Sequence, residues 1–182
     1  TTFTLSLEMA LLVPLSFAAR GTDDDAVGVL DAARRAADRV DVFAQAGCIG
    51  LGRANDLVAL LERSIHAVVP EQGLFHPKVW FLEYEADGER RYRFVCSSRN
   101  LTSDRTWDAV VALDGAPGEP ADDDRRSNRS MASLLRWLPT HTVHVTPPAR
   151  AARITALAER WAGIVWERPP DVREMSVDVL GI

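Results

Sequence analysis

Lys78 is the only lysine among the 21 lysines and arginines of the chain, and it lies two residues after His76. If this segment is a strand, both side chains project from one face, so the ammonium lies beside the imidazole. Two groups that favour positive charge are costly to desolvate together unless an anion lies between them. Lysine suits phosphate as a compact charge, whereas arginine offers a planar fork. The pair therefore predicts a phosphate site, and the alternative is a lysine whose stem lies along the end of a sheet.

A short polar segment, residues 97–100, follows the next expected strand. Residues 75–85 and 90–96 are predicted as long strands, and the Ala-Asp-Gly turn at residues 86–88 is typical of a hairpin. A hairpin brings the end of its second strand back beside the start of its first, so we expect this polar segment near His76. Its hydroxyls, amide and backbone N–H groups would donate hydrogen bonds to phosphate oxygens.

These two segments together resemble the sequence motif of the phospholipase D superfamily. That motif consists of HxK, four further residues, an aspartate, and a Gly-Ser-x-Asn or Ser-Ser-x-Asn loop after the next strand. The resemblance is greatest to the nuclease and tyrosyl-DNA phosphodiesterase branches, in which S-x-N-L is followed by a tryptophan. The chain has His76-Pro77-Lys78, then Glu83 in place of the aspartate, then Ser97-Ser98-Arg99-Asn100-Leu101-Thr102, and Trp107 as the tryptophan.

The resemblance implies a phospholipase D-like half that acts as a metal-independent phosphodiesterase through a phosphohistidine intermediate, without a metal or a cofactor. Enzymes of this superfamily build one active site from two HxK motifs, so the single motif here implies a second one from a dimer mate or a missing segment. A degenerate half that no longer catalyses is the third possibility. The implied residues are catalytic His76, Lys78 and Asn100, phosphate-binding Ser97, Ser98 and Thr102, and accessory Glu83 and Trp107.

The substrate that the resemblance favours is DNA or RNA, so a nuclease is expected. The sequence shows no membrane span and no basic amphipathic anchor, which makes a lipid phosphodiesterase the more distant alternative. The main alternative is non-catalytic: a module that binds phosphate or nucleic acid, or an interaction module of a larger protein, for example a helicase-linked or defence protein.

Other motifs predict less chemistry. The glycines of residues 47–52 are spaced GxxGxG rather than GxGxxG, and no GK[ST] follows, so an ordinary turn is expected rather than a nucleotide loop. His141 and His144 would face opposite sides of a strand, and no cysteine or carboxylate cluster accompanies them, so a metal site is not expected there. His66 has the same interpretation.

Length and composition predict one globular domain, because the chain has 182 residues of which 47% are hydrophobic and 26% charged. The net charge of −5 argues against a broad polyanion-binding surface, but acidic runs at residues 23–25 and 122–124, expected in loops, leave room for a local basic site.

Cys48 and Cys96 form neither a disulfide framework nor a zinc spacing, which favours the cytoplasm. A chain that starts at Thr1 without a methionine is compatible with a fragment of a longer protein.

The order of the elements predicts an α/β domain with a mixed sheet flanked by helices. The core is expected over about residues 1–146, followed by a C-terminal helix at about 148–166 and a tail. A turn at 21–25, a helix cap at Asn55 and a mobile loop at 115–128 are also expected. Strands are predicted at 1–7, 40–46, 65–69, 75–85, 90–96, 108–113 and 141–145, and helices at 8–19, 25–39, 56–64, 131–138 and 148–165.

Overall fold

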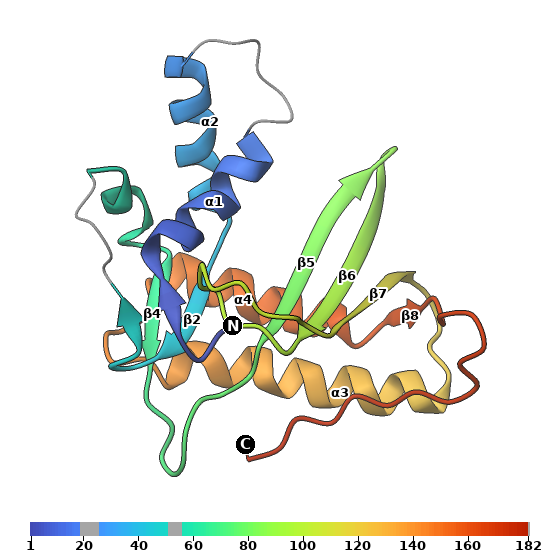
Figure 1. The fold of residues 1–182 in the computed structure, drawn as a ribbon. Helices are drawn as coiled ribbons and strands as arrows, with labels where there is room; N and C mark the ends of the chain where they lie inside the picture. Colours follow the sequence, from blue (N-terminus) through green and yellow to red (C-terminus); the bar gives the residue numbers. More distant parts are fainter. Residues whose placement is uncertain (19–25, 51–55, 182) are drawn as a thin grey trace. The chain divides into compact units, whose positions relative to one another are not determined.

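A computed structural model describes residues 1–18, 26–50 and 56–181 (Figure 1). Residue contacts divide the described chain into two compact units. Unit 1 comprises Thr1–Lys78, Arg99–Asp108 and Thr142–His144, and unit 2 comprises Val79–Ser98, Ala109–His141 and Val145–Ile182. Both units combine helices with strands, which confirms the mixed α/β class. Within the described residues, no helix is both long and apolar enough to cross a bilayer.

Unit 1 is built from short parallel strand pairs and the helices that follow them. β1 pairs with β3, and β2 pairs with β4, in parallel. Parallel neighbours need a crossover connection, and here the connections run through the helices. The elements are β1 (Leu5–Ser6), α1 (Leu7–Ala18), α2 (Ala26–Ala37), β2 (Val42–Gln45), β3 (Ile49–Gly50), the 3₁₀ helix η1 (Asp56–Leu61) and β4 (Ile65–Val68).

The core of unit 1 lies between α1 and the strands. Leu7, Ala10 and Leu11 recur at helical spacing on α1, and all three are buried. Their cluster includes residues of β1, β2 and η1, so the helix is held by packing rather than by its propensity alone. The buried members of the cluster are Leu5, Leu7, Ala10, Leu11, Val42, Ala44 and Leu61.

Unit 2 is an antiparallel sheet in the order β5-β6-β7-β8, with helices packed against it. The hairpin turn is confirmed, because Asp87 and Gly88 have φ values of 55° and 77°, the left-handed pair that a two-residue turn requires. Its elements are β5 (Val79–Ala86), β6 (Glu89–Ser97), β7 (Val110–Pro117), α3 (Asp122–Trp137), the 3₁₀ helix η2 (Leu138–Thr140), α4 (Pro148–Trp161) and β8 (Ile164–Trp166).

An aromatic cluster forms the core of unit 2. The Trp161 ring of α4 lies 5.1 Å from the Phe81 ring, 5.7 Å from the Tyr92 ring and 5.4 Å from the Trp166 ring, measured between centroids. Phe81 faces Phe94 across the hairpin, so alternate residues of β5 and β6 line the buried face. The Trp161 Nε1 atom is buried without a hydrogen-bond partner among the described residues.

The HxK segment is not part of a strand, contrary to the prediction. β5 begins at Val79, one residue after Lys78, so the argument that His76 and Lys78 share a strand face is wrong. Pro77 explains the late start, because proline has no N–H to donate to a ladder and restricts the residue before it. From Val79 onward, alternate residues of β5 face the core, since Val79 is buried and Phe81 contacts Trp161.

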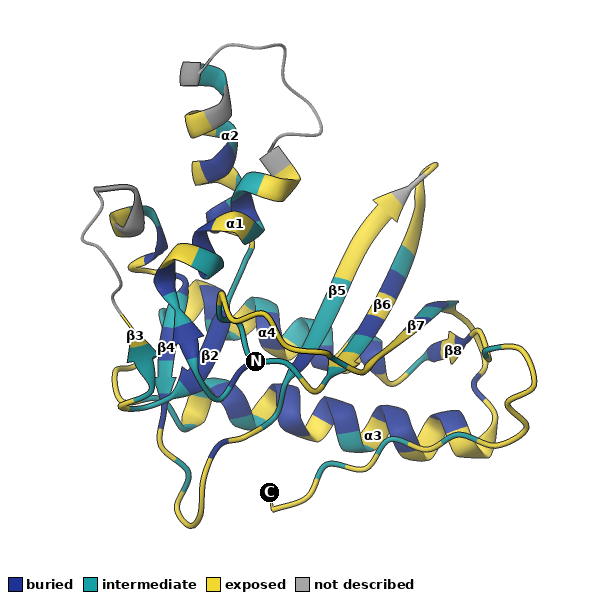
Figure 2. Cartoon of the chain, viewed as in Figure 1, coloured by how far each residue is buried: buried dark blue, intermediate teal, exposed yellow. Residues whose placement is uncertain are grey.

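Several predicted boundaries in unit 2 are also wrong. Residues 115–117 belong to β7, and the acidic run at 122–124 forms the first turn of α3, where carboxylates favour the positive helix end. Figure 2 shows α3 buried along one side and exposed along the other. α4 ends at Trp161, and β8 follows within the expected C-terminal helix. The expected strand at 141–145 is irregular apart from a bridge between Thr142 and Val68.

Unit 1 departs from the sequence-based boundaries in smaller ways. Helix η1 is 3₁₀ rather than α, and β3 lies inside the glycine-rich segment expected as a loop. The predicted turn at 21–25 and the predicted helix cap at Asn55 lie outside the described residues.

Candidate phosphate site

His76 and Lys78 contact each other just before β5. The Lys78 ammonium lies 3.1 Å from His76 Nδ1 and 3.3 Å from Nε2, so it can donate to whichever ring nitrogen carries no proton. The His76 side of this contact is exposed to solvent. The two groups thus meet without a shared strand face, and an anion can reach both from water.

Two other residues of unit 1 hold this pair in place. The neighbouring Phe75 is buried, and its backbone N–H donates to Gln45 Oε1 on β2 at 2.7 Å. The Phe3 ring lies 4.6 Å from the His76 ring between centroids. His76 is therefore positioned by a backbone anchor on one side and an aromatic contact on the other.

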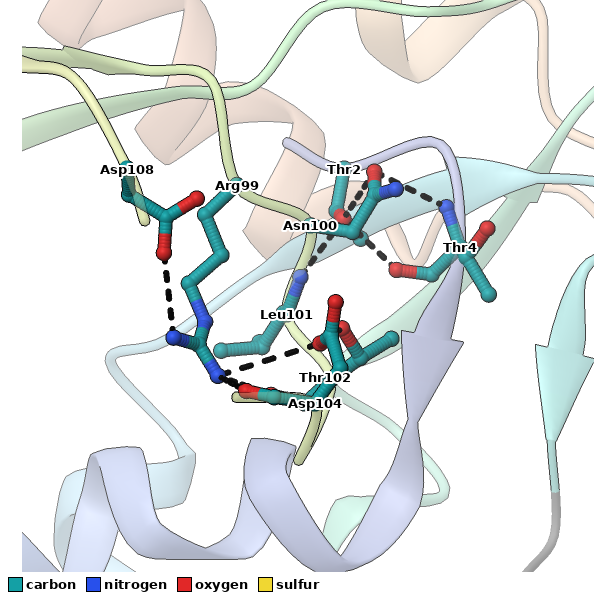
Figure 3. A network of polar contacts seen from close by, with 8 residues as sticks. All are labelled: Thr2, Thr4, Arg99, Asn100, Leu101, Thr102, Asp104 and Asp108. Atoms are coloured by element: carbon teal, nitrogen blue, oxygen red, sulfur yellow. Dashed lines mark hydrogen bonds and ion pairs between the residues drawn. The ribbon is translucent and has the colours of Figure 1, made fainter. Parts of the chain in front are cut away.

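Asn100 is locked by the N-terminal segment through one side of its amide (Figure 3). Its Oδ1 accepts hydrogen bonds from the backbone N–H groups of Phe3 and Thr4, each at 3.2 Å. A backbone N–H can only donate, so these contacts identify the accepting atom as oxygen and set the orientation of the amide. Among the described residues, no acceptor contacts Nδ2, so its two N–H groups remain available to a ligand.

The Thr2 hydroxyl ties the same two segments together. It accepts from Leu101 N at 3.0 Å and donates to Thr4 O at 2.7 Å, and Thr2 is only 2% exposed. The backbone continues the pairing, since Ser6 N donates to Leu101 O at 2.9 Å. Phe3 contacts His76 and also hydrogen-bonds Asn100, so the N-terminal segment joins the two motifs within unit 1.

Arg99 closes the loop that follows Asn100. Its Nη1 donates to Asp108 Oδ2 at 3.1 Å, and its Nη2 donates to the carbonyl oxygens of Thr102 and Asp104. The Thr102 hydroxyl donates to the Asp104 carboxylate, and this bond lowers the pKa of Asp104. The arginine and the hydroxyl therefore both stabilise the loop itself.

Ser97 and Ser98 belong to unit 2, where they extend the sheet. Ser97 pairs with Val110 at the end of the β6–β7 ladder. Ser98 N donates to Ala109 O at 2.9 Å, and Ser98 Oγ accepts from Ala109 N at 2.9 Å. These bonds give Ser98 a local structural function, so the geometry of the candidate site rests on the residues of unit 1.

Glu83 is held within unit 2 by arginines. Its carboxylate forms a two-pronged ion pair with Arg160 of α4, at 2.7 and 3.1 Å, and lies 3.8 Å from Arg90. Burial raises the pKa of the adjacent Tyr92, and the Glu83 charge adds to that effect. Glu83 thus connects β5 to α4 within unit 2.

The remaining histidines have partners of their own. His66 Nε2 lies 2.9 Å from Asp41 Oδ1, and its ring stacks on Phe43. The His141 ring stacks on Trp137 at 4.0 Å between centroids. Among the described residues, no group of three histidine, cysteine or carboxylate side chains could hold a metal ion.

Sequence reasoning missed the N-terminal contribution to the site. Nothing local to Thr2, Phe3 or Thr4 indicates that they contact a loop almost one hundred positions later. The only available signal was the short run of residues with high β propensity before α1. It predicted a strand but not the loop that this strand contacts. Comparisons with family models, with curated proteins and with solved structures give no match for this chain.

Proposed function

We propose that the chain is a phospholipase D-like half that cleaves phosphodiester bonds in nucleic acid. The observation that carries this proposal is the Asn100 amide, whose oxygen is fixed by two backbone N–H groups while its NH₂ group remains open to a ligand. Together with the Lys78 ammonium, it supplies donors for the oxygens of a phosphate near His76. The HxK and SSxN sequence pattern supports the same function.

In the proposed reaction an imidazole nitrogen of His76 attacks phosphorus. The N–P bond forms while the bond from phosphorus to the leaving oxygen breaks, and that oxygen takes a proton from a second histidine. Water then attacks the phosphohistidine and gives its proton to the second histidine, while the N–P bond breaks to release His76. Splitting one displacement into two lowers the barrier, and Lys78 and Asn100 stabilise the charge on phosphorus in both.

The second histidine must come from outside the HxK motif described here. A second copy of the chain, related by a twofold axis, brings an identical motif to the same phosphate. A further segment of a longer protein is the other source. Mixing wild-type protein with His76→Ala protein distinguishes them: after subunit exchange, activity falls with the square of the wild-type fraction if two copies share one site, and linearly if they do not.

The direct test is the cleavage of end-labelled DNA and RNA in the presence of EDTA. His76→Ala is expected to lower the rate by at least about 10²–10⁴-fold, the range for a lost acid, base or nucleophile of this kind. His144→Ala is the matched control, because His144 is an exposed histidine of the same unit. Undiminished cleavage by His76→Ala, or a strict need for added metal, would contradict the proposal.

The non-catalytic alternative has one observation in its favour, the single HxK motif in these 182 residues. A module that only binds phosphate would bind oligonucleotides through Lys78 and Asn100 and cleave none. Binding without cleavage at any protein concentration, including concentrations at which the chain dimerises, would therefore favour that alternative.

A further inference from the structure

Trp107 is the most exposed large apolar side chain of the described residues, with a relative exposure of 103%. A tryptophan normally buries a large apolar area, so complete exposure forgoes a contribution of about 2–3 kcal/mol. Trp107 belongs to the loop that begins at Arg99 and ends at Asp108, within unit 1. Such exposure is unfavourable unless the ring takes part in binding.

The Arg99 side chain clamps this loop. One guanidinium contacts the beginning, the middle and the end of the loop, through Thr102 O, Asp104 O and the Asp108 carboxylate (Figure 3). The side chain of Asp108 is only 17% exposed, so this end of the clamp is largely shielded from water and screened less than a surface pair. The loop is therefore closed on its inner side, while residues 103–107 remain exposed.

Arg105 adds a cation to the same exposed segment. It lies two residues before Trp107, and within the described part of the chain no carboxylate forms an ion pair with it. The other exposed members, Ser103, Asp104 and Thr106, are polar. The loop thus presents one flat aromatic ring and one unpaired guanidinium, with no further apolar side chain between residues 102 and 108.

We infer that this loop binds single-stranded nucleic acid, with Trp107 stacked on a base and Arg105 beside a backbone phosphate. An isolated ring among polar neighbours suits a planar base with a polar edge, whereas a protein partner or a lipid surface requires a wider apolar patch. Base faces are covered in a duplex, so stacking selects a single strand. The inference rests on the proposed function, because it assigns the substrate class of the site that Asn100 begins.

The position of this loop in the sequence supports single-stranded nucleic acid as its ligand. The loop starts at the residue before Asn100, whose NH₂ group has no acceptor among the described residues, and Trp107 follows seven residues later in the same unit. The phosphate donors and the aromatic ring are thus parts of one framework held by Thr2 and Arg99. A strand whose phosphate is bound at His76 and Lys78 would have neighbouring bases available to the ring.

The test measures the affinity of the His76→Ala protein, which does not consume its ligand, for three probes: a fluorescent single-stranded oligonucleotide, the same oligonucleotide with abasic sites, and the matching duplex. Trp107→Ala is expected to weaken binding of the base-bearing single strand about tenfold or more, and Trp107→Phe much less. Binding of the abasic strand should not respond to either substitution. Tyr84→Ala, at an exposed aromatic residue of unit 2, is the matched control.

Arg105→Ala separates the two contacts. It should weaken the base-bearing and abasic strands equally, and lower the slope of log K against log salt by about 0.7, the contribution of one phosphate contact to a single strand. The inference would be overturned if Trp107→Ala affected both strands equally or affected neither. It would also be overturned if the substitution abolished self-association, or binding to phosphatidylglycerol vesicles, instead of oligonucleotide binding. A fully exposed side chain adds little to folding, so the melting temperature should not change.

Failure of this inference is distinguishable from failure of the proposed function. Wild-type protein that binds a single strand through Trp107 but never cleaves it would retain the inference and refute the phosphodiesterase. Wild-type protein that cleaves, with a KM that Trp107→Ala leaves unchanged, would retain the phosphodiesterase and refute the inference.

Discussion

Unit 1 and unit 2 each contain an asparagine that joins distant segments, and the two use their amides differently. Asn128 of α3 is fully buried, donates from Nδ2 to Ile164 O at 2.7 Å and accepts from Trp166 Nε1 at 2.6 Å. Both sides of its amide are used inside the protein. Asn100 uses its oxygen, and among the described residues no acceptor contacts its Nδ2 atom. A satisfied amide serves the fold, whereas a half-satisfied amide that is open to solvent can bind a ligand.

The units differ in the same way in how their aromatic residues are placed. In unit 2, Trp161 and Trp166 lie in the buried cluster, and Trp166 donates its indole N–H to Asn128. In unit 1, Phe3 lies against an exposed histidine, and the Trp107 side chain is fully exposed. These aromatic residues of unit 2 thus form a core, whereas Phe3 and Trp107 of unit 1 contact an exposed side chain or solvent.

The strongest test of this contrast is Asn128→Asp. The substitution replaces a donor with a carboxylate oxygen facing Ile164 O and buries a charge without a cationic partner. We expect the free energy of unfolding to fall by about 3–5 kcal/mol, comparable to an uncompensated buried charge. Chemical denaturation measures this change, and a loss under about 1 kcal/mol would mean that Asn128 does not hold β8 to α3.

Asn100→Asp is the same substitution with the opposite expected outcome. A carboxylate still accepts from Phe3 N and Thr4 N, so the free energy of unfolding should stay within about 0.5 kcal/mol of the wild type. The lost N–H donor and the added negative charge should lower the rate of phosphodiester cleavage about 10²–10³-fold. Destabilisation with full activity per folded molecule would make Asn100 another purely structural amide.

Glycine substitutions in the two units should differ in their effect on stability, by a smaller amount than the asparagine substitutions. A Cβ atom on Gly115 of β7 would lie 2.6 Å from Ile164 Cγ2 and 2.8 Å from Trp166 Cε3, so Gly115→Ala forces β8 away. The expected cost is about 1–3 kcal/mol, as for other overpacked cores. Gly47 of unit 1 has open space around it and a φ of +82°, so Gly47→Ala should cost only about 1 kcal/mol of backbone strain. Equal losses in urea titrations would contradict the difference in packing.

The smallest effect is expected at the surface of the unit 2 sheet. The Arg93 guanidinium hydrogen-bonds the Asp114 carboxylate at 2.6 and 2.8 Å and thereby holds the pKa of that carboxyl below its ordinary value. A lowered folded-state pKa gives stability that is present above the unfolded-state pKa and is lost as the pH falls through the folded-state pKa, in practice below about pH 5.

Because this pair is exposed to water, Asp114→Asn should cost only about 0.5 kcal/mol at neutral pH. The cost should disappear in acid, where the wild-type carboxylate is also protonated. Thermal melts of both proteins between neutral and acidic pH measure the effect, and a difference that persists at low pH would assign it to packing instead of charge.

The sequence predicted well those structural features that depend only on neighbouring residues in the chain. The Asp-Gly turn at residues 87–88, the strand at 65–68 and the helix at 7–18 all follow from local backbone preference or periodicity. Predictions failed where a distant contact overrides a local signal. The run at residues 122–128 is rich in aspartate and arginine and was predicted as a loop, but Asp124, Ser127 and Asn128 are buried against β8 and the tail in a helix.

The candidate site shows the same division. The His76–Lys78 contact joins side chains two residues apart, and the sequence predicted it, although for the wrong reason, since Pro77 keeps the segment out of β5. The orientation of Asn100 depends on Phe3 and Thr4, and the loop that carries Trp107 is closed by the contact between Arg99 and Asp108. Neither arrangement has a local sequence signature.

The sequence by itself determined which residues could do chemistry: one lysine beside a histidine, an asparagine loop after the next strand, and a tryptophan beyond it. Tertiary structure alone decided which groups of that loop are already hydrogen-bonded, because the N-terminal segment binds the oxygen of the Asn100 amide and, among the described residues, leaves its NH₂ group without an acceptor. Hydrogen-bond capacity belongs to a residue type, but its use depends on which distant backbone groups arrive beside it.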